Sequence, residues 1–469
     1  MGHAYEKIVT DFYARWHKQA GNATYFLTGT DENGQKLLLA AKSEGKSVKE
    51  FVDLESEKFL TLCKNLNISN DTFIRTSDNF NHQATAFFWK KLFAKGDIYF
   101  GTYEGLYCDQ CEAFLPDSKV ENNLCPHHHL PLNLRKEEGY FLKISKYVDW
   151  LKKHIIDHPD FIIPSKYVTE TLNRLSEEIK DLSISRIYQD WGILVPDNPK
   201  FSIYTWFDAL ISYYSGLPDK DYWPANTHVI GKDILWFHAV IWPIILHAMD
   251  LPIPKHIYVH GMILASDGKK MSKSLNNGID PDLIINNYPL DSFRFYLLTA
   301  ISSTEDGPFI TTDLVSKHNK ELANDLGNLL MRVTKLFLTT GNSLTFNNFK
   351  QDLVFESTQN AMVKFINNFE HHKALLCLWE KVYEANQYIN QQEPWKLKTN
   401  PSRFNEVLYN TFYALLCIAY LVAPAMPDTS LKIFNQLGFD HLFNPLTKFE
   451  NLTFQLATPE ILFTKIDDK

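Results

Sequence analysis

The chain has few cysteines, no long apolar run and no excess of positive charge. Its 469 residues include 6 Cys, too few for a fold held together by disulfides. No apolar run is long enough to cross a bilayer, and the N-terminus lacks the charged, apolar and small-residue pattern of a signal peptide. A formal net charge of -8 argues against binding nucleic acid by bulk electrostatics, although a local basic site is still allowed. These absences predict a cytoplasmic protein that does not bind membranes.

The order of the sequence patterns predicts an α/β part followed by an α-helical part. Short apolar runs ending in Gly turns alternate with helical periods over the first two thirds of the chain, which is typical of a doubly wound parallel sheet. Long amphipathic and buried helical patterns then predict a helical bundle. We expect two halves of a catalytic domain at 1–98 and 199–258, an insertion at 99–198, a Lys-rich loop region at 259–310 and the bundle at 311–469.

Three of the cysteines lie close together and carry the spacing of a zinc knuckle. Cys108-x-x-Cys111 is followed by Cys125-x-x-His128, so three thiolates and one imidazole are available for tetrahedral Zn²⁺. His127 and His129 flank His128, and the ligating histidine stays open, although the paired spacing favours His128. Four protein ligands leave no open position, which indicates a structural ion.

A Lys-rich loop, DGKKMSKSLNNG, follows an apolar strand pattern. Most Lys-rich loops are solvated surface loops. Lysines beyond the carboxyl end of a strand in an α/β sheet are, however, placed to reach a bound anion. The loop is therefore a candidate phosphate site, with Lys269, Lys270 and Lys273 as its cations.

The residues Lys270 to Ser274, KMSKS, match the signature of class I aminoacyl-tRNA synthetases, and MGHAY resembles the end of their partner signature, His-x-Gly-His. Further stretches resemble methionyl-tRNA synthetases in order and at plausible intervals: FLTGTDENGQK, DLSISR, IYTWFDALISYY, IGKDILWFHAVIWP, ANDLGNLLMR and NQQEPW. The resemblance implies a Rossmann-like catalytic domain with a zinc-binding insertion and an α-helical anticodon-binding bundle. It also implies ligation of L-methionine to tRNA(Met) through a methionyl-adenylate formed from ATP.

The resemblance also implies roles for individual residues. The catalytic set is His3, Lys270 and Lys273, and the ATP contacts are Gly2, His3, Gly231, Asp233 and Lys273, with Mg²⁺ accompanying ATP. Methionine would be held by Asp31 at its amino group and by Trp206, Ala209, Tyr213, Ile234 and His238 around its side chain. The spacing agrees, because 206, 209 and 213 share one helix face, as do 234 and 238. The ordinary alternative is that these aromatics are core residues.

The anticodon contacts would be Asn328, Arg332 and Trp395. Asn328 and Arg332 are four residues apart on a predicted helix, and Trp395 follows a proline that would help to fix it as a stacking platform. Taken singly, these residues would be a capping Asn, a surface Arg and a core Trp. Their role therefore rests on the resemblance.

The chain departs from the family pattern at its start. The first His of His-x-Gly-His and the strand before it would precede Gly2, so we expect the chain beginning at Met1 to be poorly stable and weakly active, with a start assigned too late. Asn33 and Asn276 replace residues that are usually His and Gly. The competing interpretations are an inactive tRNA-binding protein and a class I synthetase for another amino acid. The Trp206 and His238 pocket argues against the latter, and a monomer is expected.

Overall fold

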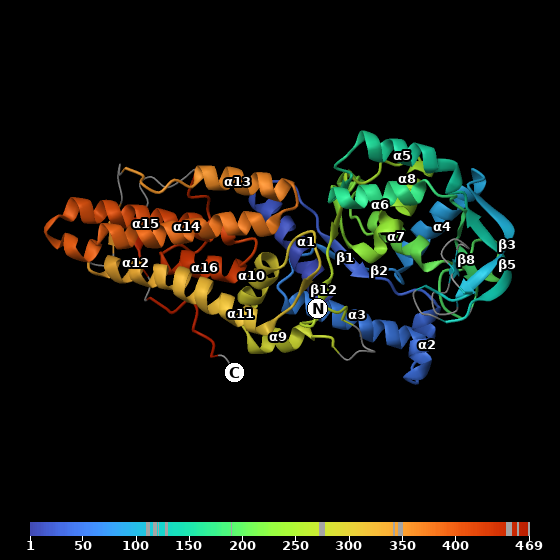
Figure 1. Ribbon diagram of the computed structural model, residues 1–469, viewed down its shortest axis with the longest axis horizontal. Coiled ribbons are helices and arrows are strands. Elements are labelled where there is room, and N and C mark those ends of the chain that lie inside the picture. Colours follow the sequence, from blue (N-terminus) through green and yellow to red (C-terminus); the bar gives the residue numbers. More distant parts are fainter. Residues whose placement is uncertain are drawn as a thin grey trace.

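A computed structural model of the chain describes residues 1–108, 113–115, 120, 122–126, 130–188, 190–271, 277–340, 343–345, 350–446, 453–456 and 459–467. The molecule is elongated, with an α/β part at one end and a helical bundle at the other (Figure 1). Helix α1 (Gly2–Gln19) lies between the two parts. The two-part organisation expected from the sequence patterns is therefore visible in the structure.

The strands predicted from TYFLTGT, HVIG and KHIYVHGMIL form parallel pairs, but KHIYVHGMIL is divided into two strands, His256–His260 and Ile263–Leu264. Among the described residues the strands of TYFLTGT and HVIG belong to two separate sheets. One sheet pairs β1 (Leu27–Thr30) with β2 (Thr72–Arg75), and the other has the order β10 (Thr227–Gly231), β11 (His256–His260), β6 (Ile162–Ile163). The connections carry helices α2 (Gln35–Ser43), α3 (Val48–Asn65), α6 (Ser165–Leu175), α7 (Thr205–Ser215) and α8 (Trp242–Ala248). The carboxyl ends of β1 and β10 lead directly into Asp31 and Gly231–Asp233, where α/β proteins bind their ligands.

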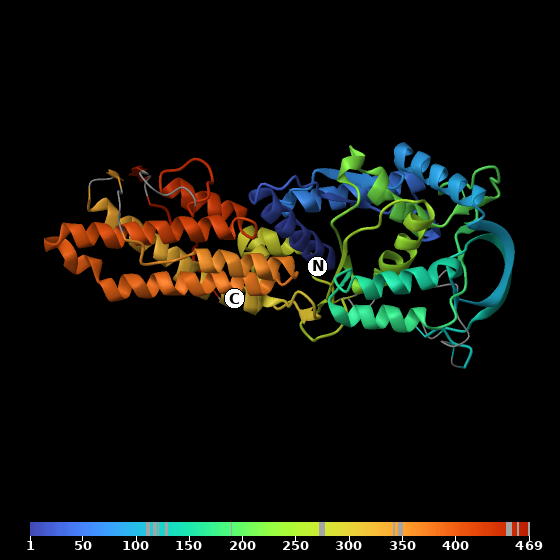
Figure 2. The same cartoon turned by 90° about the horizontal axis from the view of Figure 1, so that it is seen from above.

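An antiparallel sheet occupies the end of the molecule farthest from the bundle. Its strand order is β4 (Ala113–Leu115), β3 (Ile98–Cys108), β5 (Asn133–Leu142), β7 (Leu182–Ser183), and β3 and β5 pair over most of their length. Helices α4 (Asn79–Ala94) and α5 (Val148–Asp157) and the hairpin of β8 (Ser185–Ile187) and β9 (Phe201–Ile203) complete this end. Seen from above, the long curved strands lie at the edge of the molecule, beyond the helices (Figure 2).

A short parallel pair of strands joins the Lys-rich loop to the segment that enters the bundle. β12 (Ile263–Leu264) precedes the loop and pairs with β13 (Gly307–Pro308). Helices α9 (Pro281–Asn287) and α10 (Leu290–Ala300) lie between them in the chain. Residues before and after the loop are thus anchored to the same short ladder.

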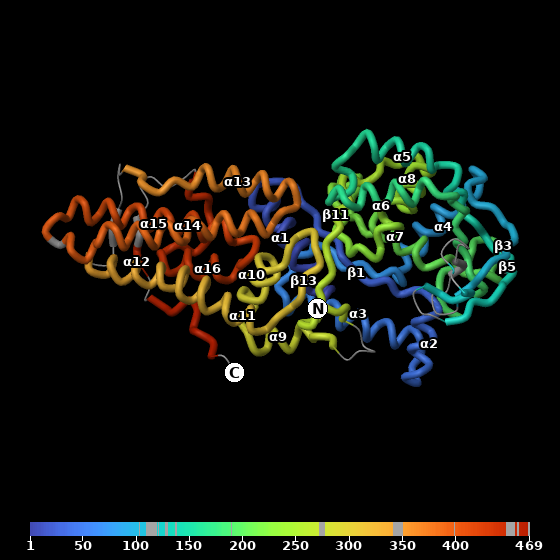
Figure 3. The backbone as a smooth tube through the Cα atoms, viewed as in Figure 1, coloured from blue at the N-terminus to red at the C-terminus, as the bar shows by residue number. Residues whose placement is uncertain are grey.

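The helical part consists of long helices around an apolar core. Its elements are α11 (Thr311–Lys317), a π-helix (His318–Gly327), α12 (Asn328–Leu338), α13 (Glu356–Asn367), α14 (His371–Gln392), α15 (Pro401–Val422), α16 (Pro427–Gln436) and the short pair β14 (Ser343–Thr345) and β15 (Thr453–Gln455). Among the described residues α15 alone is long and apolar enough to cross a membrane, but 78% of its most apolar window is buried inside the protein. The last residues run back along the bundle (Figure 3), where Asn319 Nδ2 donates to the carbonyl of Ile466 at 2.7 Å.

Helix α1 belongs to the hydrophobic core that it shares with the bundle. Its buried residues Phe12 and Tyr13 join one continuous cluster with residues of α10, α14 and α15. Tyr13 also contacts Tyr258 of β11, with ring centroids 6.0 Å apart. The first helix therefore packs against both parts of the molecule.

Candidate active site

Asp31 lies at the carboxyl end of β1, against the first turn of α7. Thr205 Oγ1 lies 2.9 Å from each of its carboxylate oxygens and from the carbonyl oxygen of Asn33, so its one proton is shared among these acceptors. Asp31 is accessible to solvent at the surface of the site. The protein packed around its carboxylate nevertheless desolvates the charged form, which raises the pKa of Asp31 to about 6. Above that pH the group is an accessible anion fixed at a sheet edge, which suits an ammonium group.

A second carboxyl group, that of Asp208 on α7, is close enough to interact electrostatically with Asp31. The Asp208 side chain is fully buried, and Asn33 Nδ2 donates to Oδ2 at 2.6 Å. Its other oxygen, Oδ1, has no hydrogen-bond partner among the described residues. Burial, and then the charge of Asp31, raise the pKa of Asp208 well above its ordinary value. Both effects favour the protonated form of Asp208, whereas Asp31 is the more accessible carboxyl group of the pair. In the sequence, Asp208 interrupts the apolar run beside Trp206 and so favours a functional site there, but no specific contact was predicted for it.

The aromatic residues predicted to hold the methionine side chain meet in the structure. Trp206 and Tyr213 are half-buried on α7, and the ring of Trp206 lies 6.1 Å from that of His238. The Tyr213 hydroxyl is 2.8 Å from His238 Nε2, and His238 Nδ1 is 3.0 Å from the carbonyl of Ile234. Because a carbonyl only accepts, Nδ1 carries the proton and Nε2 accepts from Tyr213. Burial lowers the pKa of His238 to about 4, so the imidazole is neutral at physiological pH.

The segment that carries Ile234 and His238 is not the regular α-helix that the spacing predicted. A 3₁₀ turn, Lys232–Ile234, is followed by a π-helix, Phe237–Ile241. The Trp206 ring stacks on that of Phe237, with centroids 4.0 Å apart and planes within 5°. Apolar periodicity cannot distinguish these helix types over so few residues, because they differ by one residue in hydrogen-bond span. Ala209 keeps its predicted place on α7, one turn from Trp206 and Tyr213.

His228 is a buried residue of this site that the sequence patterns did not reveal. It lies on β10, its ring centroid is 4.4 Å from that of Tyr213, and its Nε2 accepts from Trp242 Nε1 at 3.2 Å. Burial lowers its pKa to about 3. The sequence showed only that His228 occupies an inward-facing position of a predicted strand. Ordinary core residues occupy such positions too, so this pattern could not identify His228 as a residue of the site.

The residues predicted to contact ATP lie at helix and strand ends. His3 is in the exposed first turn of α1, and its ring meets that of Phe59 edge-on at 5.1 Å. Gly231 ends β10 and is followed by the exposed Asp233. A Cβ on Gly2 would meet no atom within 4 Å, so open space surrounds this residue. Helix N-termini and the carboxyl ends of parallel strands both favour bound phosphate.

The Lys-rich loop is described only in part. Lys270 is exposed and forms an isolated antiparallel bridge with Leu264 of β12. Lys273 and Asn276 lie outside the described residues. The described part therefore places the base of the loop directly after a short strand, as the sequence predicted.

The residues predicted to contact an anticodon lie together on the bundle. Asn328 begins α12 and is exposed, Arg332 is one turn later, and the guanidinium of Arg332 lies 5.9 Å from the ring centroid of Trp395. Arg332 Nη2 also donates to Asn390 Oδ1 at 2.7 Å. Trp395 is 45% exposed, so it is not the core residue that Trp usually is.

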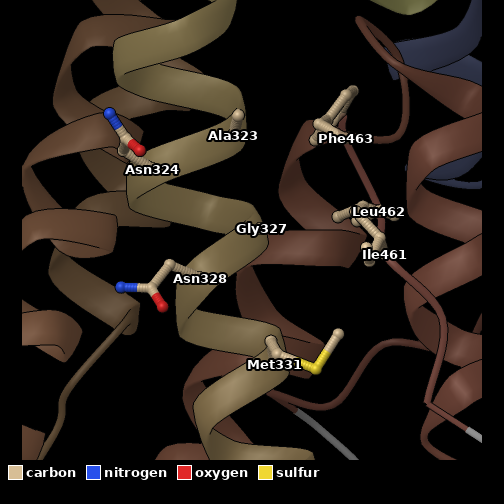
Figure 4. A pocket seen from close by; sticks show the side chains of 8 residues that line it. All are labelled: Ala323, Asn324, Gly327, Asn328, Met331, Ile461, Leu462 and Phe463. Atoms are coloured by element: carbon tan, nitrogen blue, oxygen red, sulfur yellow. The ribbon is translucent and has the colours of Figure 1, made fainter. Parts of the chain in front are cut away.

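Asn328 also lines a groove of about 340 Å³ between the helix and the C-terminal segment Ile461–Phe463. In Figure 4 the side chains of Asn324 and Asn328 project from the same side of the helix, away from that segment. Asn324 is exposed and one turn before Asn328. Asn324 therefore adds a second side-chain amide beside Asn328, and it was not among the contacts predicted from the sequence.

Half of the predicted zinc ligands can be placed. Cys108 ends β3 and Cys125 follows a turn, and both are buried in one small cluster with Leu132. The Cys125 amide donates to the carbonyl of Leu130 at 2.8 Å. Cys111 and His128 lie outside the described residues, and the described part of the chain contains no group of three or more possible metal ligands.

Comparison with known proteins agrees with this arrangement. The family model for class I tRNA synthetases (M) matches residues 1–132 and 129–334. Methionine–tRNA ligase of Thermotoga maritima is 40% identical over all of this chain and 78% of its own length, and that of Rickettsia felis is 38% identical over all of this chain and 96% of its own.

A solved structure gives the same answer. Mycobacterium tuberculosis methionyl-tRNA synthetase bound by methionyl-adenylate superposes with a TM-score of 0.92 and 33% identity, over 99% of this chain and 96% of that one. The similarity covers the α/β part and the bundle together. The chain belongs to the methionine–tRNA ligase family of class I aminoacyl-tRNA synthetases.

Proposed function

We propose that the chain activates L-methionine with ATP and transfers it to tRNA(Met), releasing pyrophosphate in the first step and AMP in the second. The observation that carries this proposal is the placement of Asp31 beside the pocket of Trp206, Tyr213 and His238, next to the carboxyl ends of parallel strands. A zwitterionic amino acid with a long apolar side chain fits this combination of one exposed anion and neutral aromatic walls.

The pocket chemistry favours a thioether. Trp206 and Tyr213 present polarizable rings, with Ala209 and Ile234 completing the wall, and His238 is neutral, so no charge is buried against the side chain. The hydroxyl of Tyr213 uses its proton in the bond to His238 and leaves an oxygen lone pair for the pocket. Asp31, ionised above about pH 6, takes the ammonium group.

In adenylate formation a methionine carboxylate oxygen bonds to the α-phosphorus of ATP, and the bond from that phosphorus to the bridging oxygen of pyrophosphate breaks. Negative charge grows on the phosphate oxygens, so positioned cations and amides provide most of the catalysis. We assign His3, Lys270 and Lys273 to this role, with Gly2, Gly231 and Asp233 forming the nucleotide contacts. Mg²⁺ would enter with the ATP phosphates, because this ion usually binds through substrate phosphates, water and one or two carboxylates.

The bundle would hold the anticodon. Trp395 offers an exposed ring for stacking, Arg332 lies above that ring, and Asn328 offers an amide one turn away. Stacking, together with hydrogen bonds to base edges, is how unpaired RNA bases are recognised. This set therefore suits single-stranded bases better than a duplex backbone.

We also assign a structural Zn²⁺ to Cys108, Cys111, Cys125 and His128. The fit rests on Cys108 and Cys125, two buried cysteines that lie at a strand end and after a turn and share one cluster. Thiolates buried in this way need a cation or a proton to be stable. The ion would tie the β3 end to the following turns, far from the aromatic pocket.

The deciding experiment is methionine-dependent ATP–pyrophosphate exchange by the purified chain. Wild type should exchange above the level of an enzyme-free control, however weakly, and Asp31→Ala should lose the methionine dependence. Asp219→Ala, which removes a surface carboxylate, should behave as wild type. Binding of tRNA(Met) without exchange would favour the alternative, an inactive tRNA-binding protein. A monomer in the cytoplasm remains part of the proposal, and so do the domain limits given above.

A further inference from the structure

Asp306 connects two segments of the candidate active site that are far apart in the chain. Its Oδ2 pairs with Lys232 Nζ at 2.5 Å, and its Oδ1 accepts from the backbone N–H of Met262 at 2.8 Å. Both side chains of the ion pair are about one third exposed. One carboxylate therefore holds a lysine ammonium with one oxygen and a backbone amide with the other.

The two partners belong to different walls of the site. Lys232 directly follows Gly231 at the carboxyl end of β10 and precedes Asp233 and Ile234. Met262 directly precedes β12, whose Leu264 forms the bridge with Lys270. Asp306 thus joins the end of β10 to the strand that carries the base of the Lys-rich loop.

The backbone around Asp306 is held independently of this ion pair. Gly307 N–H donates to the carbonyl of Met262 at 3.0 Å, and Phe309 N–H donates to that of Leu264 at 2.9 Å. A Cβ on Gly261 would lie 2.0 Å from the carbonyl oxygen of Glu305, so the two backbones touch at this glycine. These contacts would survive loss of the Asp306 charge, and a partly exposed ion pair adds little to folding.

We propose that Asp306 is a positioning residue for adenylate formation. It orients Lys232 and fixes the base of the Lys-rich loop, at the bridge between Leu264 and Lys270, relative to the end of β10. The inference rests on the proposed function, because it assigns these segments to the ATP side of the site. A flexible lysine side chain is an imprecise point charge unless a partner restrains it. Asp306 supplies that restraint from the segment that leads into the bundle.

The adjacent Glu305 provides a matched control. It pairs with Lys166 of α6 at 2.9 Å and is 65% exposed, so it lies in the same segment and carries the same charge. Its ion pair is with α6, whereas that of Asp306 is with Lys232. Glu305→Gln therefore removes one negative charge from this segment and leaves the connection described above in place.

The test compares Asp306→Asn, Asp306→Glu and Glu305→Gln in ATP–pyrophosphate exchange. We expect Asp306→Asn to lower kcat/KM for ATP roughly tenfold, because small misplacements of phosphate-side groups are costly, while KM for methionine stays within about twofold. The melting temperature should not change, Asp306→Glu should recover part of the loss, and Glu305→Gln should match wild type. Equal behaviour of Asp306→Asn and Glu305→Gln overturns the proposal. The proposal is also overturned if Asp306→Asn impairs the kinetics with ATP and with methionine alike and lowers the melting temperature, since that indicates a structural role.

Two further measurements separate this inference from the proposed function. In a double-mutant cycle, Asp306→Asn should have little additional effect in a Lys232→Met background, and full additivity would show that Asp306 does not act through Lys232. Calorimetric binding of a non-hydrolysable ATP analogue should weaken in Asp306→Asn but not in Glu305→Gln. If wild type binds the analogue without catalysing exchange, the proposed function fails, whereas the binding comparison still decides the role of Asp306.

Discussion

Arg294 of α10 and Asp11 of α1 form an ion pair with an N–O distance of 2.6 Å in which both side chains are completely buried. Arg294 also donates to the carbonyls of Leu66, Pro424 and Ala425, at 3.0, 3.1 and 2.9 Å. The guanidinium therefore ties the first helix, the end of α3 and the turn between α15 and α16 to one point. This point lies where the catalytic part meets the bundle.

Replacement of Arg294 by Met should strongly destabilise the chain. The change leaves the Asp11 carboxylate buried with a weaker set of partners and leaves three carbonyls unpaired, which typically costs about 3–5 kcal/mol. Arg15→Met is the control, because Arg15 also pairs with Asp11 but is 22% exposed, and we expect a loss of about 1 kcal/mol. Urea unfolding of both variants measures the difference, and equal losses would contradict the importance of the buried pair.

Methionine affinity should depend on pH through Asp31. Burial raises the pKa of Asp31 to about 6, so lowering the pH through that value protonates the carboxylate and removes the charge that holds the ammonium. KM for methionine should therefore rise below about pH 6, approaching tenfold per pH unit, and stay constant above about pH 7. Asp31→Asn should show a high KM without this dependence, and a flat wild-type profile would exclude Asp31 as the ammonium partner.

Removal of the Tyr213 hydroxyl should weaken methionine binding. Tyr213→Phe leaves His238 Nε2 without its donor, and a lost hydrogen bond of this kind costs about 1 kcal/mol, or roughly fivefold in affinity. The neighbouring Tyr214 faces Phe88 and Trp223 instead, so Tyr214→Phe is the matched control. Methionine KM in the exchange reaction is the readout, and an unchanged value in Tyr213→Phe would place the methionine side chain elsewhere.

Replacement of Trp395 by Ala should affect tRNA charging but not methionine activation. Loss of a stacking platform costs about 1–3 kcal/mol per base, so aminoacylation of tRNA(Met) should fall between roughly fivefold and 150-fold in kcat/KM. Exchange without tRNA should be unchanged, because Trp395 is in the bundle. Tyr383→Ala removes another exposed aromatic, 60% accessible on α14, and should leave both activities intact.

Zinc content tests the knuckle directly. Purified wild type should contain about one Zn²⁺ per chain by atomic emission, and Cys108→Ser and Cys125→Ser should each lower that content and the melting temperature. Cys377→Ser is the control, since this half-buried cysteine lies on α14, far from the cluster in the chain. Retention of zinc in both knuckle variants would mean that other residues bind it.

Local patterns in the amino-acid order identify much of the site. Trp206, Ala209 and Tyr213 share a face of α7, and Asn328 and Arg332 share a face of α12. The strands predicted from TYFLTGT, HVIG and KHIYVHGMIL contain β1, β10 and β11, each of which has a parallel partner. Helix and strand periods depend on neighbours within a few residues, so the amino-acid order is sufficient to reveal them. The order and spacing of the motifs likewise point to the methionyl-tRNA synthetase family.

What the sequence by itself determined is therefore the type of each element, the faces it presents and the family. Only the tertiary structure decided which side chains meet across elements. Asn33 and Asp208 are 175 residues apart, Lys232 and Asp306 are 74 apart, and His228 on strand β10 meets Tyr213 on helix α7. These contacts, and the π-helix that carries His238, depend on how distant segments pack, and no local period encodes that packing.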